Sequence, residues 1–396
     1  MRLKSKQVFI PSPGPGALVY GNSFYTRRDG VEKMAVRMVE TRSDLMDAVE
    51  IAFSRDNGRT WSAWEARDCV AQTPQGLHRR VPAPGFVDPE TDRLITIVLE
   101  GTLPTDDPLE GMTTYYLSYQ VSTDGGRTNQ VDEQIIQQGD YAPEHPLDGV
   151  WVGKNAIITG SRPYFRSRDG RLLFPMQVTP LGPDGEYWNP GGGATYTEAV
   201  VLIGAWREGL RMRWEVSQRV ALEPAKSTRG AIEPTVAEMP DGRLLMVMRG
   251  SNDANLALPG CKWYAVSTDG GCAWSAPQPW TYDDGGGFYS PSSISLLLRH
   301  SNGRCYWLGN ITPDNPRGNQ PRYPLIIGEV DRANLLLIRD RVVVVDDRRP
   351  HDDPSLQLSN FDAHEDRENG DIILHVSRFD ANAWHGDAYL YRLAPE

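Results

Sequence analysis

Short apolar runs separated by glycine-containing turns form the dominant pattern of this 396-residue chain. No long segment repeats its apolar residues at the 3.6-residue period of an amphipathic helix. Five turns of the Asp-Gly or Asn-Gly type, and one Thr-Asp turn, each lead into an apolar run. These turns lie 61 to 78 residues apart, at Asp29, Thr91, Asp169, Asp241, Asn302 and Asn369. Because that spacing suits four strands with generous loops, the pattern predicts an all-β, six-bladed β-propeller.

The same period predicts one domain over residues 1–396. The blades are expected at approximately 15–70, 78–135, 155–222, 229–280, 288–347 and 355–396. A propeller must join its two ends, because an unpaired strand edge would otherwise be exposed. The apolar segment within residues 7–12 is expected to supply that strand to the last blade, beside Ala388–Leu393.

A shorter motif repeats within this pattern. The order Ser-Xaa-Asp-Xaa-Gly-Xaa-Xaa-Trp occurs at residues 54–61 and 267–274, and residues 122–128 lack only the final tryptophan. In such a turn Asp accepts hydrogen bonds from nearby backbone N–H groups, Gly takes the left-handed conformation, and Trp folds back as an apolar plug. These turns are Asp boxes and resemble those of the sialidase-type β-propellers. The resemblance implies a fold and does not by itself imply an activity.

Composition narrows the possible partners. The 38 Gly, 30 Pro, 11 Trp and 16 Tyr residues fit short strands joined by turns, and a formal net charge of −11 disfavours nucleic acid. The four cysteines have neither metal-type spacing nor a disulfide-dense pattern. No metal or cofactor is therefore expected. No apolar run is long enough to span a bilayer, so the chain is expected to be soluble, with its compartment and oligomeric state left open.

The repeat also predicts which end of the propeller carries the site. Asp boxes and Asp-Gly turns should share one face, so a pocket must form from loops on the opposite face. Those loops bring together arginines, carboxylates and aromatic side chains, which suit a sugar ring with an acidic substituent. The expected substrate-binding residues there are Arg42, His78, Arg79, Arg162, Tyr187, Trp188, Tyr289 and Trp384.

Two segments resemble sialidases at the level of individual residues. Ile232–Arg249 is similar to the fourth-blade motif, in which the position of Glu233 carries a catalytic glutamate and that of Arg249 carries one arginine of a carboxylate-binding triad. Arg322 lies where the family has another triad arginine. Glu40 lies where the family has an aspartate as general acid. The resemblance therefore implies that Glu233 and Glu40 are catalytic and that Arg249 and Arg322 bind substrate.

The chain departs from that family at two places. Tyr20 begins the motif in which sialidases have the first triad arginine, and Leu358 occupies the position of their tyrosine nucleophile. Leucine cannot act as a nucleophile, so ordinary sialidase turnover is not expected. Glycosides of other sugars can be cleaved by two carboxylates, one acting as acid and the other as nucleophile or base. Glu40 and Glu233 are the expected pair, and the exo-arabinanases are a related family with a glutamate system.

Three functions follow as hypotheses. The first is an exo-acting glycoside hydrolase that removes a terminal, acidic sugar from an oligosaccharide or polysaccharide. The second is a lyase directed at uronates, in which His78 or Tyr289 removes a proton beside a neutralised carboxylate. The third is a propeller that binds carbohydrate without catalysis, favoured by Leu358. The sequence does not choose the sugar, the linkage or the stereochemical outcome.

Overall fold

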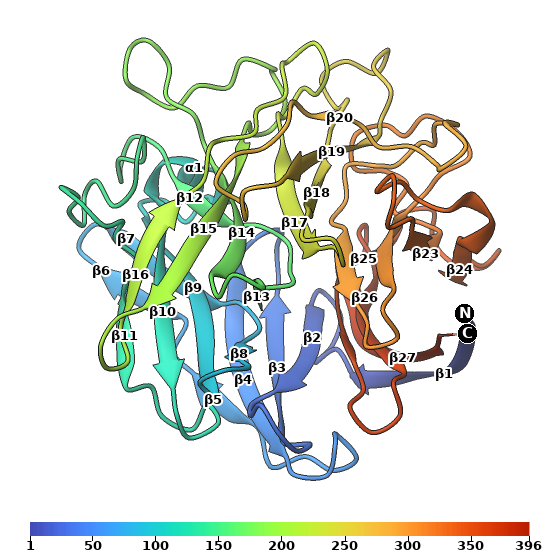
Figure 1. The fold of residues 1–396 in the computed structure, drawn as a ribbon, viewed down its shortest axis with the longest axis horizontal. Helices are drawn as coiled ribbons and strands as arrows, with labels where there is room; N and C mark the ends of the chain where they lie inside the picture. The colour runs from blue at the N-terminus through green and yellow to red at the C-terminus, as the bar shows by residue number, and fades with distance from the viewer. Residues whose placement is uncertain (396) are drawn as a thin grey trace.

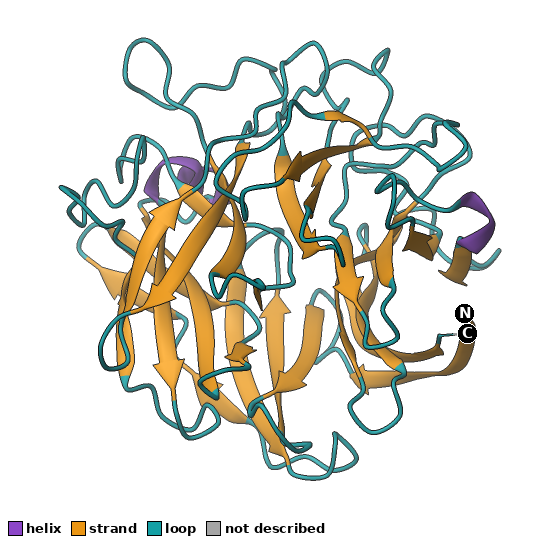
Figure 2. Cartoon of the chain, viewed as in Figure 1, coloured by secondary structure: helices purple, strands orange, loops and turns teal. Residues whose placement is uncertain are grey.

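The structure, a computed structural model that describes residues 1–395, is built almost entirely from short β-strands (Figure 2). Nearly all-β architecture is therefore confirmed. Within residues 1–395, helix is confined to the single turn α1 (Gly111–Thr114) and to 3-10 turns at Pro108–Glu110 and Arg339–Arg341. No helix in that range is long and apolar enough to cross a membrane.

The largest sheet contains both ends of the chain. Its first strand runs over Arg2–Ile10 and pairs antiparallel with the last strand, from Arg2 opposite Ala394 to Ile10 opposite Ala388. The expected pairing of an N-terminal strand with the last strand is therefore present, although the strand begins before residue 7 and ends at residue 10. A single parallel bridge from Leu18 to Gly386 joins the two halves of the sheet. In order, its strands are β25 (Leu356–Glu365), β26 (Ile372–Asp380), β27 (His385–Ala394), β2 (Leu18–Tyr25), β3 (Lys33–Glu40), β4 (Met46–Ser54) and β5 (Glu65–Arg67), with β1 (Arg2–Ile10) on β27.

Four further sheets follow one another along the chain. The second contains β6 (Val70–Thr73), β7 (Gly76–Pro82), β8 (Phe86–Asp88), β9 (Arg93–Leu103), β10 (Tyr116–Ser122) and β11 (Val131–Gln134). The third contains β12 (Ile157–Thr159), β13 (Phe165–Arg166), β14 (Leu172–Val178), β15 (Glu198–Trp206) and β16 (Met212–Val216). The fourth contains β17 (Ile232–Glu238), β18 (Leu244–Arg249), β19 (Lys262–Ser267) and β20 (Gln278–Pro279). The fifth contains β21 (Leu296–Arg299), β22 (Cys305–Asn310), β23 (Leu325–Val330) and β24 (Val343–Asp346).

Contacts between sheets lead round the molecule and return to their start. Strand β2 contacts β8, β8 contacts β13, β14 contacts β17, β17 contacts β21, β21 contacts β25, and β25 contacts β2. In Figure 1 the colours accordingly pass in chain order around the view, and the two termini lie together at its edge. Apolar side chains fill the spaces between neighbouring sheets. Tyr119 of β10 and Trp214 of β16, for example, pack edge to face with their ring centroids 5.2 Å apart.

The Asp boxes have the geometry that the motif predicts. Asp56 accepts hydrogen bonds from the backbone nitrogens of Arg59 and Thr60, at 3.0 and 2.8 Å. Gly58 has a left-handed φ of 81°, which favours glycine. The same backbone contacts recur at Asp124 and Asp269. No Asp-box residue lines the main cavity of the molecule, so these turns stabilise strand ends that lie away from it.

Candidate active site

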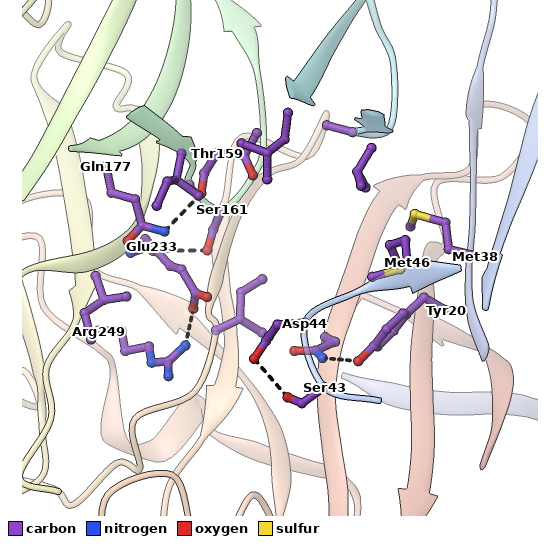
Figure 3. Close-up of a pocket in the computed structure, with 18 of the residues that line it drawn as sticks. Tyr20, Met38, Ser43, Asp44, Met46, Thr159, Ser161, Gln177, Glu233 and Arg249 are labelled. Carbon is purple, nitrogen blue, oxygen red and sulfur yellow. Dashed lines mark hydrogen bonds and ion pairs between the residues drawn. The ribbon is translucent and has the colours of Figure 1, made fainter. Parts of the chain in front are cut away.

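A cavity of about 560 Å³ gathers side chains from all five sheets. In Figure 3 Glu233 and Arg249 lie on one side of it, Tyr20, Met38 and Met46 lie on the other, and Asp44 lies between the two groups. The sequence-predicted residues that line the cavity are Glu40, Arg79, Arg162, Glu233, Arg249, Arg322 and Trp384. The structure thus brings together residues that are up to 344 positions apart in the chain.

Glu233 lies at a distorted start of β17. The ladder between β17 and β18 is irregular between Ile232 and Thr235, and Glu233 has a φ of 44°, which is unusual for a residue with a side chain. Its backbone is fixed on both sides: its N–H donates to Gln177 Oε1 at 3.1 Å, and its carbonyl accepts from Ser161 Oγ at 3.0 Å. This strained backbone directs the carboxylate into the cavity.

Three arginines surround the Glu233 carboxylate. Arg249 donates to it from Nη1 at 2.6 Å, and Arg229 and Arg322 are close enough to act on its charge. Burial favours the neutral carboxyl, but these positive charges outweigh burial and lower the pKa of Glu233. Glu233 is therefore ionised at neutral pH.

The arginines retain more positive charge than Glu233 neutralises. Among residues 1–395 neither Arg229 nor Arg322 has an ion-pair partner: Arg229 donates to Thr195 Oγ1, and Arg322 donates to Gln357 Oε1 at 2.9 Å. Burial and the charge of Arg249 lower the pKa of both guanidinium groups to about 10. The three guanidinium groups carry two more charges than the Glu233 carboxylate neutralises, and a second anion would relieve this repulsion.

Glu40, the other expected catalytic carboxylate, has the opposite character. It is 2% exposed and accepts a hydrogen bond from the Tyr20 hydroxyl at 3.0 Å, while Asn360 Nδ2 donates to the same hydroxyl at 2.9 Å. Burial, together with the negative charge of Asp44, raises the pKa of Glu40 to about 8. Glu40 therefore holds a proton at neutral pH. Two carboxyl groups with pKa values moved apart are the arrangement expected of an acid and a base in one site.

Two predicted arginines in the cavity are already occupied by carboxylates. Arg162 donates to both oxygens of Asp362, at 3.1 and 2.6 Å. Arg79, which is only 3% exposed, donates to both oxygens of Asp106 at 2.7 and 2.9 Å and to the Met46 carbonyl at 2.7 Å. Their guanidinium groups hold the cavity wall together, which leaves Arg229 and Arg322 without a carboxylate partner, beside Arg249, which is paired with Glu233.

Five predicted residues lie outside the cavity. Arg42 is exposed and pairs with Asp106. His78 contacts Thr102 Oγ1 at 3.1 Å and Glu100 at 3.4 Å. The Tyr187 hydroxyl accepts from the Tyr196 N–H at 2.7 Å, and Trp188 is 47% exposed. Tyr289 instead lines a second, apolar cavity, beside Trp263, Trp280 and Phe288.

Sequence reasoning did not include Tyr20 or Asp44 among the expected site residues, and it expected Arg229 and Asn360 in pocket-facing segments without giving either a role. One physical signal unites several lining residues: Asp44, Glu233, Asn360 and Trp384 all have a positive φ between 44° and 64°. Left-handed backbone at residues other than glycine is costly and collects at functional sites. Asn and Asp tolerate that conformation best, but neither residue type reveals it without the fold. Within residues 1–395 no group of three or more His, Cys, Asp or Glu side chains could hold a metal ion.

Comparison with known proteins agrees with this architecture. The family model described as a BNR repeat-like domain matches residues 41–342. A comparison of the sequence with curated proteins finds no significant match.

Solved structures resemble the fold along nearly the whole chain. A Dyadobacter fermentans DSM 18053 protein of unknown function matches with a TM-score of 0.63 at 16% identity, over 99% of each chain. The intramolecular trans-sialidase of Ruminococcus gnavus matches with a TM-score of 0.62 at 14% identity, over 98% of this chain and 97% of that one. The NanB sialidase of Streptococcus pneumoniae matches with a TM-score of 0.61 at 12% identity, over 98% of this chain and 70% of that one. At these identities the likeness shows a sialidase-like fold.

Proposed function

The chain belongs to the family of BNR repeat-like domains, and from that premise we propose that it is an exo-acting glycoside hydrolase that removes a terminal, acidic sugar. We propose equally that residues 1–396 form one domain of six blades. The circuit of sheet contacts from β2 through β25 and back supports that arrangement.

The observation that carries the proposal is the cluster of three arginines around Glu233, whose positive charge one carboxylate neutralises only in part. Arg229, Arg249 and Arg322 face one carboxylate and have capacity for a second anion. The carboxylate of an acidic sugar meets this need, because guanidinium groups bind carboxylates through charge-assisted hydrogen bonds. In this proposal Arg229 supplies the third carboxylate-binding arginine, since Tyr20 begins the motif in which sialidases have the first arginine of their triad.

The two catalytic roles follow from the two pKa shifts. Glu40, with a pKa raised to about 8, donates a proton to the oxygen of the leaving group. Glu233 is ionised and acts on the anomeric carbon, either directly or through water. Tyr20 and Asn360 keep the Glu40 carboxyl in place through their hydrogen-bonded chain.

Binding without catalysis is the second candidate. Leu358 is fully buried, at 0% exposure, so this position supplies no nucleophile to the cavity. In that case the arginine cluster would hold an acidic sugar that is never cleaved. The lyase hypothesis has less support, because His78 and Tyr289 both lie outside the cavity that contains the arginines.

The test is hydrolysis of a panel of aryl glycosides of sialic acid, glucuronate, galacturonate, rhamnose and arabinofuranose. We expect turnover of an acidic member by the wild type, and a loss of at least about 100-fold in Glu233→Gln. Glu215→Gln is the matched control, because Glu215 is exposed on β16, away from the cavity. Retention of activity in Glu233→Gln would end the assignment, and saturable binding without turnover would favour the binding function.

A further inference from the structure

The cavity has two chemically unlike walls. Opposite the arginine cluster lies a surface that we call the apolar wall, and Figure 3 shows Met38 and Met46 on this side, across from Glu233 and Arg249. The wall is assembled from two neighbouring sheets, from α1 and from the 3-10 turn before it. It comprises Met38, Met46, Val81, Pro82, Leu109 and Met112.

The apolar wall is held in a fixed shape. Arg79 joins its parts by donating to the Met46 carbonyl and to Asp106, which precedes the short helical turn. A capping box fixes the start of that turn. Asp107 Oδ1 accepts from the Leu109 N–H at 2.9 Å, and the Glu110 carboxylate accepts from the Asp107 N–H at 3.3 Å. Leu109 is nevertheless 53% exposed. The loop therefore holds the Leu109 side chain at the mouth of the cavity. Exposure of this apolar side chain to water is unfavourable, and a bound apolar group would remove it from water.

The wall lies on the side of the expected general acid. Glu40 and Met46 are direct partners in the ladder between β3 and β4, and Met38 precedes Glu40 by two residues on the same face of β3. A general acid must reach the oxygen of the leaving group within hydrogen-bonding distance. The group beyond that oxygen must therefore lie against Met38, Met46 and their neighbours.

Resting on the hydrolase function proposed above, we propose that the substrate is an acidic sugar joined to an apolar alkyl or aryl aglycone. A second sugar in the same place would bring hydroxyl groups to side chains that cannot hydrogen-bond with them. Desolvating such hydroxyls without partners is unfavourable, whereas covering methionine, proline and leucine with hydrocarbon is favourable.

The experiment compares methyl and octyl glycosides of glucuronate and of sialic acid by calorimetric binding and by turnover. We expect the octyl glycoside of the preferred sugar to bind at least about tenfold more tightly than its methyl counterpart. Leu109→Ser and Met112→Ser should each reduce that ratio severalfold. Val344→Ser is the control, because Val344 is 56% exposed on β24 and does not line the cavity.

Equal binding of methyl and octyl glycosides would overturn the inference, and so would a preference that Leu109→Ser leaves unchanged. The inference would also be overturned if none of the four compounds bound, because contact of the octyl chain with the apolar wall should by itself give measurable binding. An octyl preference without cleavage would support the apolar wall and contradict the hydrolase function. Cleavage of the methyl and octyl glycosides with equal efficiency would support the hydrolase function and contradict the apolar wall. The two proposals can therefore fail independently.

Discussion

Arg249 donates to the Glu233 carboxylate at 2.6 Å, and the backbone of Glu233 is left-handed, with a φ of 44°. The salt bridge keeps the Glu233 carboxylate ionised although it is partly buried. It also leaves Arg229 and Arg322 without anionic partners among residues 1–395. The three guanidinium groups therefore carry two more positive charges than the Glu233 carboxylate neutralises.

Replacement of Arg229 by Gln should stabilise the free protein and weaken ligand binding. One of three mutually repelling cations is removed, so the free energy of unfolding at low salt should rise by about 1 kcal/mol. Affinity for the acidic sugar should fall by about 10- to 100-fold, because a charge-assisted hydrogen bond is lost. Denaturant unfolding and calorimetry measure the two effects. Destabilisation with unchanged affinity would show that Arg229 is structural.

Replacement of Glu40 by Gln should stabilise the protein above pH 5. The folded pKa of Glu40 is raised to about 8, from an ordinary value of 4.5, by burial and by Asp44. The unfolded chain therefore releases this proton first, and the wild type loses stability as pH rises from 4.5 to 8. The loss is roughly 2–5 kcal/mol, and Gln removes it. Unfolding at pH 5 and pH 8 measures the difference, with exposed Glu208→Gln as control. A parallel pH dependence in wild type and Glu40→Gln would refute the raised pKa.

The sequence predicted the fold class and the central carboxylates better than the rest of the site. Repeated turns and Asp boxes report directly on strand connections, so nearly all-β architecture and the pairing of β1 with β27 could be expected. The resemblance to sialidases singled out Glu233 and Glu40, and both line the cavity. His78 and Trp188 were not placed correctly in the cavity, because loop conformation decides where such side chains point. Arg229 was expected in a pocket-facing segment but was given no role, because only the fold shows that it lies close to Arg249.

The His375 side chain should make the protein sensitive to acid. Its Nε2 lies 2.9 Å from Ser23 Oγ, at the junction of β26 with β2, and burial, aided by Lys33 and Arg162, lowers its pKa to about 3. The unfolded chain takes up this proton near pH 6.5, so stability is lost as pH falls from 6.5 towards 3. The expected loss is roughly 3–5 kcal/mol.

Unfolding of His375→Gln at pH 7 and at pH 4.5 measures that contribution. The variant should lose less stability than the wild type on acidification. His351→Gln serves as the control, because the His351 side chain is 76% exposed. If His375→Gln and His351→Gln respond to acid equally, the buried ring does not cause the sensitivity.

Deletion of residues 1–12 should destabilise the whole ring. It removes every β1 pair with β27, together with the ion pairs from Lys4 to Asp371 at 2.7 Å and from Lys6 to Asp346 at 2.5 Å. The exposed edge of β27 should also promote association between molecules. Thermal unfolding and size-exclusion chromatography measure both effects. A midpoint within about 2 °C of the wild type, with no association, would mean that β1 is dispensable.

The proposed roles of Glu40 as general acid and of Glu233 as the carboxylate that acts on the anomeric carbon are tested most directly by varying the leaving group. The measurement is kcat/KM on 4-nitrophenyl and methyl glycosides of the preferred sugar, for wild type, Glu40→Gln and Glu233→Gln. A 4-nitrophenolate leaves without protonation, so Glu40→Gln should lose at least about 100-fold on the methyl glycoside and little on the other. Glu233→Gln should lose both activities. Equal losses for Glu40→Gln on the two substrates, or none in Glu233→Gln, would contradict the account.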